Sequence, residues 1–253
     1  MTDRGGALVA GSNSGSGMQP STLVARADEV IAELVAAYDA VVAAEQASAL
    51  QENVGRLRCM YGWWAWINRS SKLLLAAAAA GLEHEAAPNV RSILEHTLAL
   101  LWVCDEGNTA LDAIEAAWKV RQGELYDELI AAGWPVPDDV TRADTVEHPR
   151  MRTILKIHRL FVAYDAHYLY IPYRMLSTHV HPSAKGATGY LTDDGLSAQP
   201  TRPGNDRVLV ALCLMWAAEA MNTVFAGDQL SAAISRVEEI LETRVERPQP
   251  SKT

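Results

Sequence analysis

Apolar side chains recur along this chain with the three- and four-residue spacing of an α-helix, and this period constrains the fold more than any other feature. In the first such stretch, over 21–50, the apolar positions are Leu23, Val30, Ile31, Leu34, Val35, Tyr38, Val41 and Val42. Side chains at this spacing line one face of a helix, which then packs against its neighbours. The sequence has no strand–helix–strand alternation and no internal repeat. We therefore predict an all-α protein built as a single helical bundle.

Glycines, prolines and polar capping residues mark where the helices begin and end. Proline suits the first turn of a helix, and glycine suits the position just after its last turn. The expected helices, about seven or eight in number, cover 21–50, 51–80, 88–105, 108–132, 150–167, a segment beginning at Pro172, 205–226 and 229–245. Between them, 182–204 is rich in glycine and proline, which predicts one long irregular loop. Asp194–Gly195 favours a short hairpin inside that loop.

The chain is long enough for one domain with a substantial core, since it has 253 residues of which 49% are hydrophobic. Residues 1–20 contain GSNSGSG, a composition typical of a flexible, disordered tail. We expect a helical domain over 21–247 and a second flexible tail over 248–253. Of the three adjacent tryptophans, Trp63, Trp64 and Trp66, two are expected in the core and one at the surface, because they cannot share one helix face.

Composition limits which binding partners and which cellular compartment we expect for this protein. The formal net charge of −9 argues against non-specific binding of nucleic acid, which depends on neutralising phosphates. Three dispersed cysteines without a CxxC pair fit a reducing, cytoplasmic setting. The longest apolar run, Val208–Ala218, is too short to span a bilayer, so no membrane partner is predicted. No metal-ligand pair such as HExxH and no glycine-rich nucleotide loop occurs, which predicts neither a metal nor another cofactor.

Polar residues gather in two places that could form one site. Ser177 and His181 lie four positions apart near the end of the helix that begins at Pro172, so their side chains can meet. Arg91 and Glu95 have the same spacing in the helix over 88–105. Two interpretations are open for that pair. It is either a surface ion pair of little consequence or a half-buried pair that faces Ser177 and His181.

These residues carry a resemblance to a known family. Arg91 and Glu95 form an Arg-xxx-Glu motif, and 173–182 reads Tyr-xx-Leu-Ser-xxx-His-Pro. Both motifs resemble an uncharacterised family of all-helical bacterial proteins that is defined only as a domain of unknown function. The resemblance covers roughly 88–186, and it implies a helical fold and a polar site without an activity.

A second, weaker resemblance points to an activity. Arg91 and His96 fit the Arg-x(4–6)-His pattern of HEPN ribonucleases, with Ser92 where that family usually has Asn, Asp or His. It implies a helical homodimer that cleaves RNA at its dimer cleft, often in a toxin or phage-defence setting. On an ideal helix Arg91 and His96 point about 140° apart, so they could converge only if the helix started late, at Asn89, or bent.

The leading hypothesis is therefore a HEPN-like helical protein that acts on RNA. The basic residues expected to hold RNA are Arg150, Arg152, Lys156 and Arg159. The alternative is a non-enzymatic helical binding or scaffold protein whose polar cluster is structural. A hydrolase that uses Ser177 and His181 ranks third, because no acid is in reach and no oxyanion donors are visible in the sequence. The position of His96 relative to Arg91 distinguishes the first two.

Overall fold

The computed structural model is an all-α bundle, as the helical period predicts. The residues that it describes are 20–45, 47–137, 140–144, 147–181, 188–193, 195–197 and 206–251. The expected N-terminal tail, apart from its last residue, therefore lies outside the described residues.

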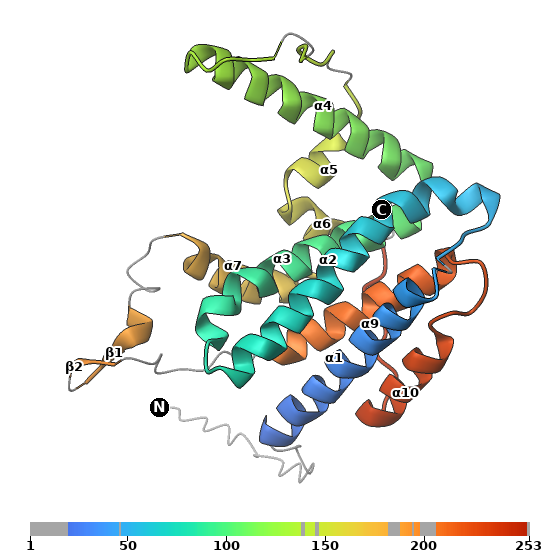
Figure 1. Ribbon diagram of the computed structural model, residues 1–253, viewed down its shortest axis with the longest axis vertical. Helices are drawn as coiled ribbons and strands as arrows, with labels where there is room; N and C mark the ends of the chain where they lie inside the picture. The colour runs from blue at the N-terminus through green and yellow to red at the C-terminus, as the bar shows by residue number, and fades with distance from the viewer. Residues whose placement is uncertain are drawn as a thin grey trace, which may run out of the picture.

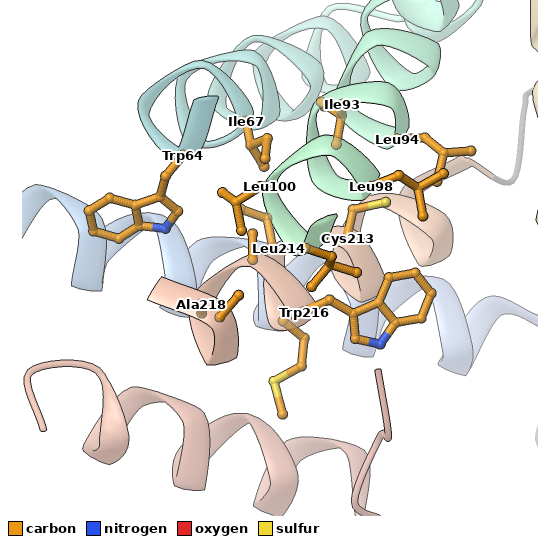
Figure 2. Close-up of a cluster of buried hydrophobic side chains, with 14 of the residues drawn as sticks. Trp64, Ile67, Ile93, Leu94, Leu98, Leu100, Cys213, Leu214, Trp216 and Ala218 are labelled. Carbon is orange, nitrogen blue, oxygen red and sulfur yellow. The ribbon is translucent and has the colours of Figure 1, made fainter. Parts of the chain in front are cut away.

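Five helices form the body of the bundle: α1 (Pro20–Ala43), α2 (Val54–Ala79), α3 (Glu83–Glu106), α9 (Asp206–Val224) and α10 (Ser231–Leu241). Helix α9 runs through the middle and packs against the other four (Figure 1). Its side chains meet those of α2 and α3 in the core, where Trp64, Leu98 and Leu214 belong to one buried cluster (Figure 2).

Helix α9 is apolar on nearly every side because it is surrounded by other helices. By length and composition alone it could cross a membrane, but most of it is buried inside the protein. A helix that is hydrophobic all round is expected at the centre of a large bundle. Its apolar character is therefore accounted for by the core.

Helix α4 (Asn108–Ala131) stands away from the body of the bundle, at the top of Figure 1. Gly107 joins it to α3 with a φ of +58°, a conformation that glycine adopts at little cost. The end of α4 nearest the bundle packs closely through small buried residues, which are Ala110, Ala113, Ala116 and Ala117. The far end is held by the returning chain, where Arg142 makes a two-pronged hydrogen bond to Asp127.

The predicted single helix over 150–167 is wrong. Its residues form α5 (Met151–Leu155) and α6 (His158–Ala163), separated at Lys156, which has extended backbone angles (φ −124°, ψ 93°). Helix α5 buries none of its side chains, so little packing opposes the break. With this division the described residues hold nine α-helices.

Two helices begin earlier than their prolines suggest. Helix α3 starts at Glu83 instead of Pro88, and α7 (His167–Val180) starts at His167 instead of Pro172. In both helices the proline is the sixth residue, where it removes one backbone hydrogen bond. Burial of side chains ahead of each proline, such as Ala87 and Leu169, favours the longer helix.

The hairpin expected in the long loop is confirmed. Strands β1 (Leu191–Thr192) and β2 (Gly195–Leu196) pair antiparallel, with Leu191 opposite Leu196. They follow the short 3-10 turn Thr188–Tyr190, and the Tyr190 hydroxyl donates a hydrogen bond to Glu85 at the start of α3. The hairpin lies to the side of the bundle in Figure 1.

The C-terminal segment, for which composition predicts a flexible tail over 248–253, contacts α6 where the structure describes it, at 248–251. Pro248 is buried, and Ser251 donates from its backbone N–H to the Ala163 carbonyl over 2.7 Å. The Ser251 hydroxyl also donates to the Val162 carbonyl over 3.0 Å. Residues 248–251 are thus attached to α6 by hydrogen bonds to its backbone, which composition alone does not reveal. Residues 252 and 253 lie outside the described part of the chain.

Candidate functional site

Arg91, Glu95 and Tyr173 form a polar cluster where α3 meets α7. Arg91 Nε donates to Glu95 Oε1 over 3.1 Å, and Arg91 Nη2 donates to the Tyr173 hydroxyl over 3.0 Å. That hydroxyl in turn donates to Glu95 Oε1 over 2.9 Å. The guanidinium also lies 5.0 Å from the centre of the Tyr173 ring, within cation–π range. Each member of the cluster therefore contacts the other two.

The cluster is half-buried, and its surroundings change the acidity of the tyrosine. The exposed side-chain fractions are 21% for Arg91 and 31% for Glu95, whereas Tyr173 is buried. Burial raises the pKa of the Tyr173 hydroxyl above its usual value, and the hydrogen bond to Glu95 raises it further. The hydroxyl thus remains a hydrogen-bond donor at neutral pH.

A shallow, open depression adjoins the cluster. Its volume is about 250 Å³, and it is lined by Pro88, Arg91, Ser92, Glu95 and Val180. It lies between α3 and α7, where the sequence predicts a polar pocket, but Ser177 and His181 are not among the residues that line it. Because the depression is open, it exposes the edge of the cluster to water and does not enclose a ligand.

Ser177 and His181 do not join this network in the way that their spacing suggests. The Ser177 hydroxyl donates to the Tyr173 carbonyl over 2.8 Å, within its own helix. Helix α7 ends at Val180, and His181 is exposed with extended backbone angles (φ −113°, ψ 143°). The four-residue relationship holds only inside a helix, so the end of α7 separates the two side chains.

His96 lies on a different side of α3 from Arg91. Its ring stacks on Trp66 of α2, with centroids 5.6 Å apart and planes inclined by 24°. His96 Nδ1 is 2.7 Å from the Ser92 carbonyl oxygen, which favours the tautomer protonated at Nδ1. Arg91 faces α7 and His96 faces α2. Because α3 begins at Glu83, the late helix start that would bring them together does not occur.

The four basic residues predicted to hold RNA lie on α5, α6 and the residues beside them. Arg150 is half-buried and pairs with Glu106. Arg152, Lys156 and Arg159 are exposed. These three are available to an anionic partner, whereas Arg150 is engaged within the protein.

Two residues that the sequence does not single out as site residues contact those that it does. Tyr173 contacts Arg91 and Glu95, and Trp66 stacks on His96. Tyr173 stands in the apolar stripe of its helix with Leu169 and Leu176, where its hydroxyl requires a partner. The need for a hydrogen-bond partner is the feature of the sequence that could have identified Tyr173 as part of the polar cluster. The expectation of one surface tryptophan is confirmed. Trp66 is 48% exposed, whereas Trp64 is buried and Trp63 is half-buried.

Within the described ranges, no group of three His, Cys, Asp or Glu side chains could hold a metal ion. Comparisons with protein-family models, with characterised proteins and with solved structures found no match. The function must therefore be inferred from the chain itself.

Proposed function

We propose that this protein is a non-enzymatic helical scaffold that pairs with a second copy of itself through α4. The observation that carries the proposal is the outer stripe of α4, formed by the exposed Trp118, Arg121, Leu125 and Glu128 and the half-buried Leu129. At about 100° per residue these positions fall on one side of the helix. Trp118 is 59% exposed and Leu125 is 56% exposed. Large apolar side chains on a projecting helix are typical of an interaction surface.

The charges on this stripe favour a second copy as the partner. In an antiparallel pair of α4 helices centred on Leu125, that leucine meets its equivalent at the two-fold axis. Arg121 then lies beside Glu128 of the second copy, and the same ion pair forms again on the other side of the axis. Trp118 meets Ala132 of the second copy, which leaves room for its ring. The stripe is thus complementary to itself in both charge and size.

The cluster at α3 and α7 supports a structural interpretation of the polar residues. Arg91, Glu95 and Tyr173 satisfy one another, and the Ser177 hydroxyl is bonded to its own helix. A catalytic base or nucleophile needs a geometry in which it reaches a substrate. Here the hydrogen bonds of the Tyr173 hydroxyl join α3 and α7, and the others stay within one helix.

Sedimentation of charge variants tests the pairing. The wild type should be a dimer, whereas Leu125→Asp and Arg121→Glu should be monomers. The double variant Arg121→Glu/Glu128→Arg should dimerise again, because the ion pair is restored with its signs exchanged. Leu73→Asp on α2 is the control, since Leu73 is similarly exposed at 53%. A monomeric wild type, or a dimer that Leu125→Asp leaves intact, would contradict the proposal.

A second candidate function, action on RNA, is favoured by one observation. His96 is held against the exposed ring of Trp66, a pair that could stack with an unpaired base. If this candidate is correct, the wild type cleaves single-stranded RNA and His96→Ala abolishes cleavage with little change in the thermal midpoint. Absence of cleavage by a folded dimer leaves the scaffold as the function.

A further inference from the structure

The outer face of α7 is apolar, although it lies opposite the face that packs into the core. Leu169, Tyr173 and Leu176 are buried, while Tyr168, Ile171 and Met175 point away from them. The exposed fractions of these three are 61%, 66% and 53%. Their spacing of three and four residues places them in one stripe. Helix α7 is therefore apolar on two sides.

The segments that carry and precede this apolar stripe in the sequence are rich in positive charge. Between 150 and 181 the chain has five Lys or Arg residues and one acid, Asp165, although the whole chain is acidic. Arg174 is exposed on α7 itself, and Arg152, Lys156 and Arg159 are exposed on the segments just before it. Among the described residues these four cations make no ion pair. The local charge thus favours an anionic partner.

We propose that the outer face of α7, together with the cations on and between α5 and α6, binds the surface of an anionic lipid bilayer. A bilayer surface offers acyl chains for Ile171 and Met175 and anionic headgroups for the neighbouring Lys and Arg. RNA would use the cations but not the exposed aliphatic side chains. The binding is peripheral, and it differs from the expectation of no membrane partner, which considered only a spanning segment.

Vesicle flotation with the full chain tests this proposal. The protein should bind vesicles of phosphatidylcholine mixed with phosphatidylserine and should bind pure phosphatidylcholine weakly. Ile171→Asp/Met175→Asp and Arg159→Glu/Arg174→Glu should each lower the partition coefficient about tenfold or more. Because the four side chains are exposed, both variants should stay folded, which circular dichroism checks.

Matched controls lie on α2. Leu73→Asp introduces one acid at a similarly exposed site, and Arg58→Glu/Arg69→Glu reverses two exposed cations there. Both controls should bind as the wild type does. Equal binding to neutral and anionic vesicles, no binding at all, or equal loss in the controls would overturn the proposal. Binding to single-stranded RNA in place of vesicles would also overturn it. Sedimentation of the dimer is a separate measurement, so either proposal can fail alone.

Discussion

The Tyr173 hydroxyl donates a hydrogen bond to Glu95 Oε1 over 2.9 Å, which links α7 to α3. Arg91 reaches both residues, so the link includes one positive charge, one negative charge and one neutral hydroxyl. Hydrogen bonds that involve a charged group are stronger than neutral ones. The cluster should therefore contribute to stability.

The first prediction concerns Glu95. Replacing it with Ala leaves the Arg91 guanidinium without its carboxylate and the Tyr173 hydroxyl without its acceptor. We expect a loss of about 1–3 kcal/mol in the free energy of unfolding, measured with urea. Glu115→Ala is the control, because Glu115 forms an i,i+4 pair with Lys119 that is more exposed. The loss in the free energy of unfolding should be much smaller for Glu115→Ala. Equal losses for the two variants would show that the contact of Glu95 with α7 adds nothing to stability.

The second prediction compares two arginines with similar hydrogen bonds and different burial. Arg247 binds both oxygens of Asp105, at 2.9 and 2.7 Å, and Asp105 is only 14% exposed. Arg142 binds Asp127 in the same two-pronged way, but both side chains are more than half exposed. Arg247→Ala should lower the free energy of unfolding by about 2–4 kcal/mol, because it leaves the half-buried Asp105 carboxylate without its counter-charge.

Arg142→Ala should change stability little, since water and salt screen an exposed pair. Urea unfolding of both variants gives the comparison. Similar losses would mean that burial does not set the contribution of these pairs.

Most of the fold could be predicted because the long helices carry a strong apolar period. The exceptions are short or depend on packing. Helix α5 has no buried side chain, so its separation from α6 at Lys156 left no periodic signal. The start of α3 at Glu83 depends on burial of Ala86 and Ala87, which is decided by neighbouring helices. Local sequence rules cannot report such contacts.

The site was predictable only where its residues share a helix. Arg91 and Glu95 are four positions apart, and their pairing follows from helical geometry. The contact of Arg91 with Tyr173 joins residues 82 positions apart, so it depends on how α7 packs on α3. The same four-residue spacing fails for Ser177 and His181, because Pro182 favours an extended conformation for the residue before it. That effect outweighed the predicted pairing with Ser177.

The last prediction is a pH dependence at Tyr164. This tyrosine is 3% exposed, and its hydroxyl donates to Asp105 Oδ2 over 2.8 Å. Burial raises its pKa far above the ordinary value of 10.0, and the charge of Asp105 raises it further. In the folded protein the hydroxyl therefore keeps its proton under conditions in which the unfolded chain loses it.

The sign follows from proton binding. Below about pH 10 both states are protonated, so Tyr164 adds no pH dependence. Above about pH 10 the unfolded state binds fewer protons, and the free energy of unfolding should fall by about 1.4 kcal/mol per pH unit from this group. Urea unfolding from about pH 8 to about pH 11 should show a steeper alkaline loss for the wild type than for Tyr164→Phe. Parallel curves for the two proteins would mean that Tyr164 ionises as easily in the folded state as in the unfolded one.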